Sequence, residues 1–493
     1  MNGDGAAGGA SLLERLGELA DGCRARTTEA HRKGLGQFFT SPRIARFLAD
    51  YPSLSGSAGK LRILDPGAGV GILGVAMAQR VLRETQASVH LVAVEPDPLA
   101  AAGLRLALDA ARSAFGERFS AEHLGEDFLA LDPATLGHAR VSPVDLVIAN
   151  PPYFKVSPSE DLGGDAPNIY ARFMEVSSRL LVPGGQLSCI VPRSFTSGAY
   201  FERFRRRFFS SMSLEKAHVF DSRRDAFRAD GVLQENVIAL LRCGPTSDLD
   251  VVLSSSGGES DLDAPSLLLA PRTLVFPRDR HASIFFPTFA EDLRTIRLFQ
   301  GWKGSLAELG LEVSTGPVVP FRCREHLRSR PAAGRTSPML WMQHVRSGAI
   351  TWPLGDGFRK PEYICTRGDE RLLVPNLTYV ILRRFSAKEE RRRIVGGVLR
   401  KGSLPGSHLG LENHLNFIHR PGGELLDREA DALAALLGSE LFDRYFRLTS
   451  GHTQVNATEL RELPLPSLEH LTSPMDLQPR REVLAQAEAA LGR

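Results

Sequence analysis

The chain has 493 residues, of which 43% are hydrophobic and 24% are charged, and its formal net charge is only +3. This is the composition of a soluble globular protein with roughly two or three domains. The sequence has no long apolar span and its start lacks the signal-peptide pattern, so the cytoplasm is the default expectation. The five cysteines are isolated from one another, which argues against a disulfide framework and a zinc site, so we expect a cytoplasmic protein that uses no metal.

Two capped helices are predicted near the N-terminus. Residues 11–14 have the capping-box pattern, and apolar residues at helical spacing extend this helix into the twenties. After a loop that starts with glycine, Thr40 or Ser41 can cap a second helix in which Pro42 takes the first position. We assign residues 1–34 to an N-terminal arm and begin the first domain at residue 35.

A buried parallel strand is predicted at residues 61–65, followed at once by a glycine-rich turn and an apolar helix. Gly67 and Gly69 in this turn allow the backbone to approach a ligand closely, with the helix N-terminus behind it. Asp65 directly precedes the glycines, where its carboxylate would repel a dinucleotide pyrophosphate. The same carboxylate would attract a cationic amino-acid head group.

The next two predicted strand ends also carry carboxylates. Glu95 ends the strand at residues 89–94, where it can accept both hydroxyl hydrogens of a ribose. Asp127 can accept from an adenine amino group, and the adjacent Phe128 can stack on the ring. An amino-acid end, a ribose and an adenine together describe S-adenosylmethionine, which we take as the cofactor.

A fourth predicted strand, residues 144–149, ends abruptly at Asn150-Pro151-Pro152-Tyr153. Each proline fixes its own φ and holds the preceding residue extended. The Asn150 side chain and the Pro151 carbonyl are then acceptors beside an aromatic ring, which suits a planar amino group. A strand followed by a proline-rich turn would explain the stretch alone, so the upstream strand ends decide its interpretation.

The ordered motifs resemble the gamma class of amino-group DNA methyltransferases, the TaqI-like N6-adenine enzymes, closely over the first half of the chain. The resemblance implies a Rossmann-like, S-adenosylmethionine-dependent α/β sheet with helices on both faces. Ser41 and the Asp65-Pro66-Gly67 start depart from the usual forms of these motifs without removing an acceptor. The motifs are Gly36-Gln37-Phe38-Phe39-Thr40-Ser41-Pro42, Asp65-Pro66-Gly67-Ala68-Gly69, Glu95, Asp127-Phe128 and Asn150-Pro151-Pro152-Tyr153.

The resemblance also implies roles for individual residues. Cofactor contacts are expected from Phe39, Thr40 and Asp65 at the methionine end, Gly67 and Gly69 in the turn, Glu95 at the ribose, Asp127 and Phe128 at the adenine, and Asn150. The target base would be held by Asn150, Pro151, Pro152 and Tyr153. A second aromatic residue would pack on the far face of the base, and we choose Phe227, with Phe220 in reserve.

The chemistry expected of this site is methyl transfer to an amino nitrogen. Hydrogen bonds from the adenine amino group to Asn150 and to the Pro151 carbonyl would free the nitrogen lone pair for in-line attack on the methyl group. A base inside duplex DNA cannot reach such a pocket and must be flipped out.

The second half of the chain has a different character. Residues 244–265 are rich in Ser, Gly and Asp and are predicted to be a linker or variable loop, so we place the first domain at 35–245. Residues 246–493 are then a mixed α+β part with short strands, basic turns and a helix at 433–448. This part resembles, more loosely, the target-recognition half of PstI/BsuBI-type modification methylases. The candidate DNA contacts are Arg322, Arg324, Arg328, His452, Gln454 and Asn456, although a structural loop explains the last three equally well.

Together these features predict a DNA N6-adenine methyltransferase, the modification enzyme of a type II restriction–modification system. We expect a monomer that acts on duplex DNA, with any cognate endonuclease on a separate chain. Three alternatives stay open: an N4-cytosine methyltransferase, a glutamine side-chain methyltransferase, and a non-catalytic DNA-binding specificity subunit.

Overall fold

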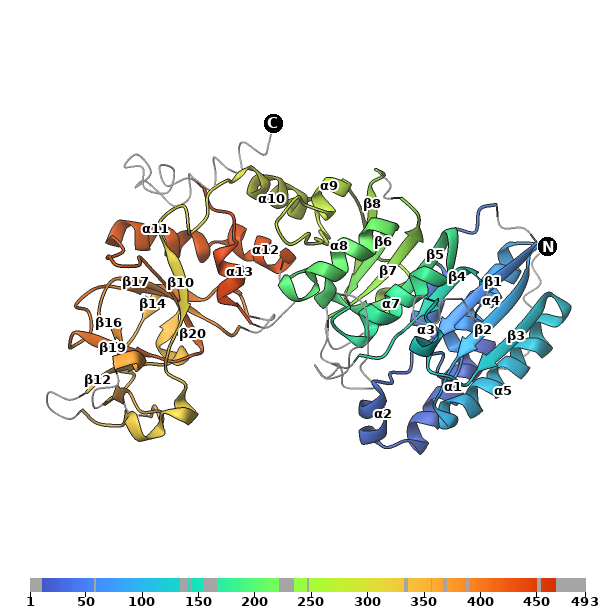
Figure 1. The fold of residues 1–493 in the computed structure, drawn as a ribbon, viewed down its shortest axis with the longest axis horizontal. Helices are drawn as coiled ribbons and strands as arrows, with labels where there is room; N and C mark the ends of the chain where they lie inside the picture. Colours follow the sequence, from blue (N-terminus) through green and yellow to red (C-terminus); the bar gives the residue numbers. More distant parts are fainter. Residues whose placement is uncertain are drawn as a thin grey trace. The chain divides into compact units, whose positions relative to one another are not determined.

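The computed structural model divides the chain into two compact units, Met1–Phe289 and Ala290–Arg493. Figure 1 shows the fold of each unit. None of the described helices is long and apolar enough to cross a membrane. The described residues are 11–56, 59–133, 141, 143–153, 166–220, 235–245, 248–331, 336–355, 357–366, 370–386, 390–449 and 454–466.

The first unit is built on one nine-stranded sheet with the strand order β3-β2-β1-β4-β5-β7-β6-β8-β9. Strands β1 to β5 are parallel, whereas β7 runs antiparallel to both of its neighbours, β5 and β6. The strand order reverses between β1 and β4, and ligands bind beyond the carboxyl ends of the strands at such a switch point. The strands are β1 (Lys60–Pro66), β2 (Ser88–Val94), β3 (Phe119–Leu124), β4 (Val144–Ala149), β5 (Leu181–Pro192), β6 (Met212–Phe220), β7 (Asn236–Cys243), β8 (Val251–Ser256) and β9 (Ser266–Ala270).

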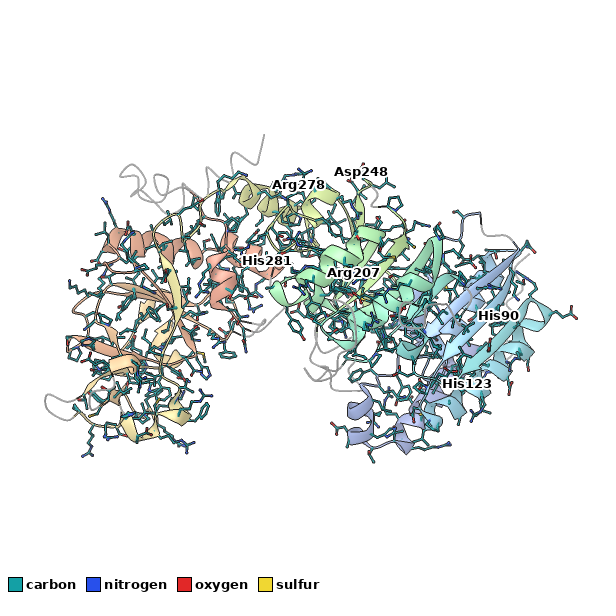
Figure 2. All side chains as sticks on the ribbon, in the orientation of Figure 1. His90, His123, Arg207, Asp248, Arg278 and His281 are labelled. Carbon is teal, nitrogen blue, oxygen red and sulfur yellow. The ribbon has the colours of Figure 1, made fainter. Side chains whose placement is uncertain are left out.

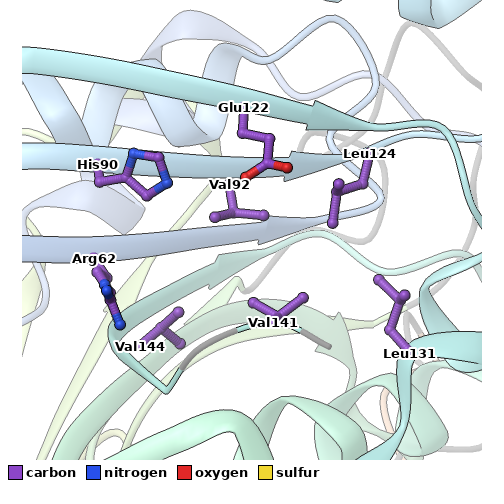
Figure 3. A pocket seen from close by; sticks show the side chains of 8 residues that line it. All are labelled: Arg62, His90, Val92, Glu122, Leu124, Leu131, Val141 and Val144. Atoms are coloured by element: carbon purple, nitrogen blue, oxygen red, sulfur yellow. The ribbon is translucent and has the colours of Figure 1, made fainter. Parts of the chain in front are cut away.

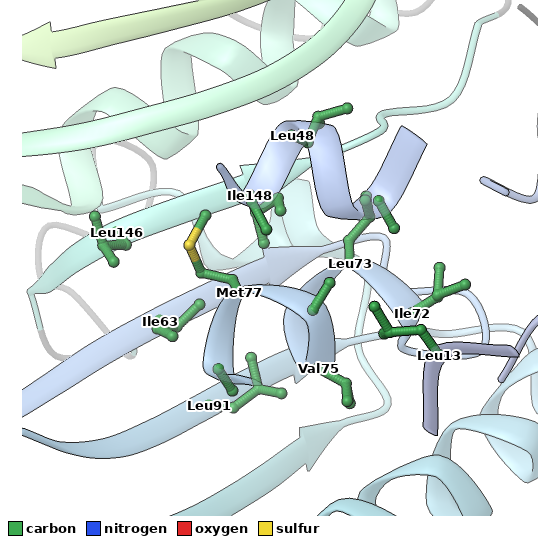
Figure 4. Packing of buried hydrophobic residues seen from close by; sticks show 14 of the residues in the cluster. Leu13, Leu48, Ile63, Ile72, Leu73, Val75, Met77, Leu91, Leu146 and Ile148 are labelled. Atoms are coloured by element: carbon green, nitrogen blue, oxygen red, sulfur yellow. The ribbon is translucent and has the colours of Figure 1, made fainter. Parts of the chain in front are cut away.

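Helices cover both faces of this sheet, as predicted. On one face, alternate strand residues such as Ile63, Leu91 and Ile148 pack with Met77 of α4 in the main core (Figure 4). Helices α7 and α8 contact β5 and β6, and none of their described residues belongs to that core, so they cover the opposite face. The helices of this unit are α1 (Leu12–Arg26), α2 (Glu29–Leu35), α3 (Pro42–Ala49), α4 (Ile72–Glu84), α5 (Pro98–Phe115), α7 (Ile169–Leu180), α8 (Glu202–Ser211) and α9 (Arg272–Val275).

The ends of α1 and α3 confirm the predicted caps. The Ser11 hydroxyl accepts from the Glu14 N–H at 3.3 Å, and the Glu14 carboxylate accepts from the Ser11 N–H at 2.6 Å. The Ser41 hydroxyl caps α3 by accepting the Ile44 N–H at 3.2 Å. Both helices therefore begin where the sequence places their caps.

The N-terminal residues are part of the first unit, and the predicted separate arm is wrong. α1 buries Leu12, Leu13 and Leu16 in the main core and packs against α4 and α5. The predicted boundary after residue 34 falls inside α2. A capped amphipathic helix has the same pattern whether or not it docks on a neighbouring domain, so the sequence did not reveal this packing.

The predicted linker at residues 244–265 is also wrong, because β8 lies within it and pairs with β6. Ser254 and Ser256 on β8 are buried, and their hydroxyls lie 2.9 and 3.1 Å from the two ring nitrogens of His218. These partners satisfy the serine hydroxyls and allow a polar strand to be buried. The boundary predicted at 245/246 therefore falls inside the sheet, whereas the units separate after residue 289.

The second unit is mixed α+β, as predicted, with small sheets in the orders β10-β20-β17-β18, β11-β15-β12-β19-β16 and β13-β14. The single helix predicted at 433–448 is instead two helices, which are separated at Gly438 and Ser439; the Ser439 hydroxyl caps the second one. The elements are α10 (Ala290–Gly301), β10 (Glu312–Thr315), β11 (Leu327–Arg328), β12 (Ser337–Leu340), β13 (Val345–Arg346), β14 (Ala349–Ile350), β15 (Tyr363–Ile364), β16 (Val374–Pro375), β17 (Tyr379–Arg383), β18 (Gly396–Leu399), β19 (His408–Leu411), β20 (Leu415–His419), α11 (Asp427–Leu437), α12 (Glu440–Thr449) and α13 (Ala457–Arg461).

Candidate active site

A cavity of about 480 Å³ lies at the carboxyl ends of β1, β2 and β4, where the topology predicts a ligand. Its size falls within the range of small-molecule sites. The segment between α2 and α3 covers part of it. Eight predicted site residues line this cavity, namely Phe39, Thr40, Gly67, Gly69, Glu95, Asp127, Asn150 and Pro152.

The turn after β1 is shaped by glycines in the left-handed region of backbone conformation. At Gly71, φ is +87°, and a Cβ atom would lie 2.7 Å from the Leu104 side chain. At Gly69, φ is +57°, and a Cβ would meet the Phe39 ring. The turn can therefore follow this path and remain close to the cavity only with glycine at these positions.

Asp65 is fully buried beneath this turn and does not line the cavity. One carboxylate oxygen accepts the Gly74 N–H at 2.8 Å, and the other has no hydrogen-bond partner among the described residues. Burial raises the pKa of Asp65 to about 7; the Gly74 hydrogen bond opposes this shift and the nearby Glu95 adds to it. Asp65 thus holds the first turn of α4. Because its side chain is not part of the cavity lining, the structure does not support the predicted direct contact between Asp65 and the cofactor.

Glu95 lines the cavity with its carboxylate oriented by two backbone groups. One oxygen accepts the Gly69 N–H and the other accepts the Asp97 N–H, both at 2.8 Å. Burial raises the pKa of Glu95 to about 7, and the two backbone hydrogen bonds oppose the shift. Each oxygen retains a second lone pair for a ligand hydroxyl.

Asp127 and Phe128 have different positions relative to the cavity. Asp127 lines it and accepts the Leu129 N–H at 3.0 Å. Phe128 is fully buried and is not part of the lining; it packs against Phe173, with ring centroids 4.9 Å apart. Phe173 of α7 lines the cavity instead, so the cavity lining does not contain the ring predicted to stack on the adenine.

The Asn150 side chain is fixed at both of its ends. Its amide nitrogen donates to the Phe38 carbonyl oxygen at 3.1 Å and to the Thr40 hydroxyl at 3.0 Å. Its amide oxygen accepts from the Tyr153 hydroxyl at 2.5 Å, and that hydroxyl also lies 2.9 Å from the Ile190 carbonyl oxygen. Because a carbonyl oxygen can only accept, the Phe38 contact fixes which end of the amide is the nitrogen.

Tyr153 stacks on Phe38, with ring centroids 5.4 Å apart, and it lies beside the cavity rather than in its lining. Pro151 is buried, whereas Pro152 lines the cavity. The structure therefore brings the Asn-Pro-Pro-Tyr turn to the cavity, with the Tyr153 hydroxyl on the oxygen predicted to bind the target amino group.

The structure describes one of the two phenylalanines considered for the far face of the base. Phe227 lies outside the described residues, as do Phe154 and His452. Phe220 is buried in the main core, 4.7 Å from His218 between ring centroids, and does not line the cavity. Phe220 is therefore a core residue.

The candidate DNA contacts of the second unit differ in exposure. Arg322 and Arg324 are exposed, while the Arg328 guanidinium donates to the carbonyl oxygens of Glu325 and Leu327 at 2.6 and 2.8 Å. Gln454 forms a β-bridge to Phe385, and Asn456 caps α13. Gln454 and Asn456 therefore have structural roles in the fold, which is the alternative to DNA contact that the sequence left open.

Several cavity residues were not predicted. Gln37 and Phe38 lie inside the motif at residues 36–42, although no role was predicted for them, and Asp97 is the N-cap of α5 just after Glu95. His31 lies 3.6 Å from the Asp97 carboxylate and comes from the stretch predicted to be an arm. The unpredicted lining residues with polar or aromatic side chains are His31, Gln37, Phe38, Asp97 and Phe173.

A second cavity of about 230 Å³ lies along β1, β2 and β3 (Figure 3). Arg62, His90 and Glu122 line it together with apolar side chains, and it contains none of the predicted site residues. We assign no function to it.

Comparisons with known proteins identify the family of the chain. The model of the Eco57I restriction-modification methylase family matches residues 117–227. The type II methyltransferase M.PstI of Providencia stuartii is 33% identical over 473 residues, which cover 94% of this chain and 92% of that protein. The type II methyltransferase M.BsuBI of Bacillus subtilis is 35% identical over 463 residues, which cover 90% of each.

Among solved structures, the DrdV–DNA complex aligns with 97% of this chain and 60% of that one at 13% identity and a TM-score of 0.50, a likeness of fold. The sequence relatives carry the assignment, because they match nearly the whole chain. The protein is therefore a DNA methyltransferase and belongs to the family of type II restriction–modification methyltransferases that includes M.PstI and M.BsuBI.

Proposed function

We propose that the protein transfers a methyl group from S-adenosylmethionine to the N6 atom of an adenine flipped out of duplex DNA. It would act as the modification enzyme of a restriction–modification system in the cytoplasm, with any cognate endonuclease on another chain. The observation that carries the proposal is the Asn150 amide, fixed by Phe38 and Thr40 at the rim of a cavity lined by Glu95 and Asp127.

The polar atoms of the cavity fit this cofactor. Buried oxygens of Gln37 and Asp97 have no hydrogen-bond partner among the described residues, and both residues line the cavity. An acceptor-rich lining favours a ligand with many donors, and the ammonium, ribose hydroxyl and adenine amino groups of S-adenosylmethionine are donors. Glu95 would hold the ribose, Asp127 the adenine amino group, and Phe173 the face of the adenine ring.

When bound, the cofactor supplies an electrophilic methyl group on sulfur. Asn150 and the Pro151 carbonyl would accept the two amino hydrogens of the target base, which favours a tetrahedral nitrogen with its lone pair free to attack. The Asn150 oxygen has a second lone pair, so it could accept from the base amino group beside the Tyr153 hydroxyl. The Tyr153 ring would stack on the base. These residues act by orientation and electrostatics.

Methyl transfer tests the proposal directly. Methylated bases would be mapped by sequencing DNA from cells that express the protein, and tritiated methyl incorporation would be measured in vitro. N6-methyladenine at one recurring sequence is the expected result. Detection of N4-methylcytosine would instead identify cytosine as the target base. Cofactor binding without incorporation of the methyl group into DNA would favour a non-catalytic DNA-binding subunit.

The Asn150→Ala variant tests the mechanism. We expect kcat to fall by about 10²- to 10³-fold, because one oriented hydrogen-bonding group is lost from the transition state. Asn150→Asp keeps acceptor oxygens at the same place and should retain more activity than Asn150→Ala. Cofactor affinity and the thermal midpoint would be measured in parallel, and an Asn150→Ala enzyme with wild-type kcat would refute the mechanism.

A further inference from the structure

A row of aromatic side chains leads from the Asn-Pro-Pro-Tyr turn to the surface of the first unit. Tyr153 contacts Tyr170 edge to face with ring centroids 6.5 Å apart, and Tyr170 stacks on Phe201 at 5.8 Å. Phe201 in turn contacts Tyr200 edge to face at 5.2 Å. Tyr200 ends the row with 65% of its surface exposed. Two buried rings, Tyr170 and Phe201, thus connect the exposed Tyr200 ring with Tyr153 of the proposed base-binding turn.

The exposed Tyr200 ring is held in one place. Its hydroxyl donates to the Pro167 carbonyl oxygen at 2.6 Å, just before α7 begins. A side chain that is already ordered loses less conformational entropy when a partner stacks on it.

The loop that carries Tyr200 is shaped by Arg205, which is fully buried on α8. Its guanidinium donates to the carbonyl oxygens of Phe195, Ser197 and Gly198 at 3.0, 2.9 and 2.7 Å, and to that of His281 at 2.7 Å. These bonds tie the start of α8 to the segment around His281, and they leave Arg205 unavailable to a phosphate. Arg205 is therefore a positioning residue for this loop.

Exposed arginines follow Tyr200 along α8, and others lie in the segment that Arg205 ties to the start of this helix. Glu202 and Asp279 are the acidic residues interspersed among them in sequence, so positive charge predominates. Figure 2 labels two of these arginines, Arg207 and Arg278. The exposed arginines are Arg203, Arg206 and Arg207 on α8 and Arg278 and Arg280 before His281.

We propose that Tyr200 and the α8 arginines form a DNA-contact surface of the first unit, separate from the recognition residues of the second unit. Tyr200 would stack on a nucleotide that flanks the flipped adenine, and the arginines would bind neighbouring phosphates. The inference rests on the proposed function and adds to it the place where the first unit contacts DNA. An aromatic ring beside basic residues is the combination that binds unpaired or distorted nucleic acid.

The contribution of Tyr200 is tested with full-length variants and unmethylated plasmid DNA. We expect Tyr200→Ala to raise the KM for DNA by about tenfold or more, because one stacking contact is lost, while cofactor affinity stays unchanged. Tyr200→Phe keeps the ring and loses only the hydroxyl, so its KM should stay within about threefold of wild type. Because Tyr200 is exposed, we expect both variants to fold as the wild type does.

The arginines are tested by the salt dependence of binding to a fluorescein-labelled duplex of random sequence. Each lost phosphate contact should reduce the slope of log K against log salt by about 0.9, so the Arg203→Ala/Arg207→Ala double variant should lose up to about two units. Arg105→Ala, an exposed arginine on α5, is the matched control and should keep the wild-type slope. A wild-type salt slope in the double variant would refute the proposed contacts of Arg203 and Arg207 with DNA phosphates.

Different results would refute the proposed methyl transfer and the proposed DNA-contact surface. A wild-type protein that transfers no methyl group would refute the proposed function, while the binding assay would still report on Tyr200 and the arginines. Wild-type activity combined with an unchanged KM for Tyr200→Ala and an unchanged salt slope for the double arginine variant would refute the contact surface alone.

Discussion

Glu95 is the residue at which the charge state of the cavity can be measured most directly. Its carboxyl lies in the lining, and burial raises its pKa to about 7. In the proposed complex the ribose hydroxyls would donate to the ionised carboxylate, so cofactor binding should lower the pKa of Glu95 and release a proton. Below the raised pKa, binding must displace that proton; above it, the group is already ionised.

We therefore expect the affinity for S-adenosylmethionine to fall as the pH is lowered from about 7.5 to about 5.5, by up to roughly tenfold per unit below the pKa. Isothermal titration calorimetry in buffers of different ionisation enthalpy would measure both the affinity and the released proton. Glu95→Gln should bind more weakly and with little pH dependence. Equal affinity of the wild-type protein at both pH values would contradict this assignment.

The residues at strand ends could be predicted from the sequence, and those that depend on side-chain direction or long-range packing could not. Glu95, Asp127 and Asn150 lie at the cavity because parallel strands end at one edge of the sheet. Asp65 also ends a strand, yet its side chain points beneath the turn. Phe173 approaches the cavity from α7, and no local pattern connects it with Asp127.

At the scale of the element, the glycine turn and α4 set the shape of the site. Gly71 is the N-cap of α4 and has a φ of +87°, which an alanine adopts only with strain. Gly22 offers a contrast, because it lies inside α1 and an added Cβ would meet no atom within 4 Å.

We expect Gly71→Ala to destabilise the protein by about 1–3 kcal/mol through backbone strain alone, with the Leu104 contact adding to this. Gly22→Ala should stabilise it by about 0.4–1 kcal/mol, because alanine restricts the unfolded chain and favours the helix. Urea unfolding followed by circular dichroism would measure both changes. A stabilising Gly71→Ala would show that the turn differs from the one described here.

The predicted elements of the first 150 residues were largely confirmed because capping residues, glycine turns and apolar runs are local signals. The strand β8 escaped prediction because its serines have the pattern of a loop. Their burial depends on His218, a residue of β6 that precedes them by more than thirty positions. Only the tertiary structure brings these groups together.

For the whole molecule, the boundary between the units decides which fragment can fold. All nine strands of the large sheet and the whole lining of the 480 Å³ cavity lie before residue 290. A cut at residue 245 would instead remove β8 and β9 and expose the edge of β6, with His218 on it.

We expect a fragment of residues 1–289 to bind S-adenosylmethionine with the affinity of the full chain and to lose methylation of specific sites. A fragment of residues 1–245 should be poorly soluble or unfolded, because a row of backbone groups and apolar side chains on β6 loses its cover. Calorimetry and circular dichroism on the two fragments would decide. A folded, cofactor-binding 1–245 fragment would show that β8 and β9 are dispensable.

The hydrogen bonds from the Asn150 amide nitrogen to Phe38 and Thr40 connect the two ligand sites that we propose. Residues 37–40 border the cavity proposed for the cofactor, while the oxygen of the same amide would accept the amino group of the base. A cofactor that displaced this segment would also displace the Asn150 amide. Thermodynamic reciprocity then requires that the cofactor and the extruded base alter each other's affinity by the same factor. Occupancy by the methyl donor would thereby help to determine how long a base stays outside the helix.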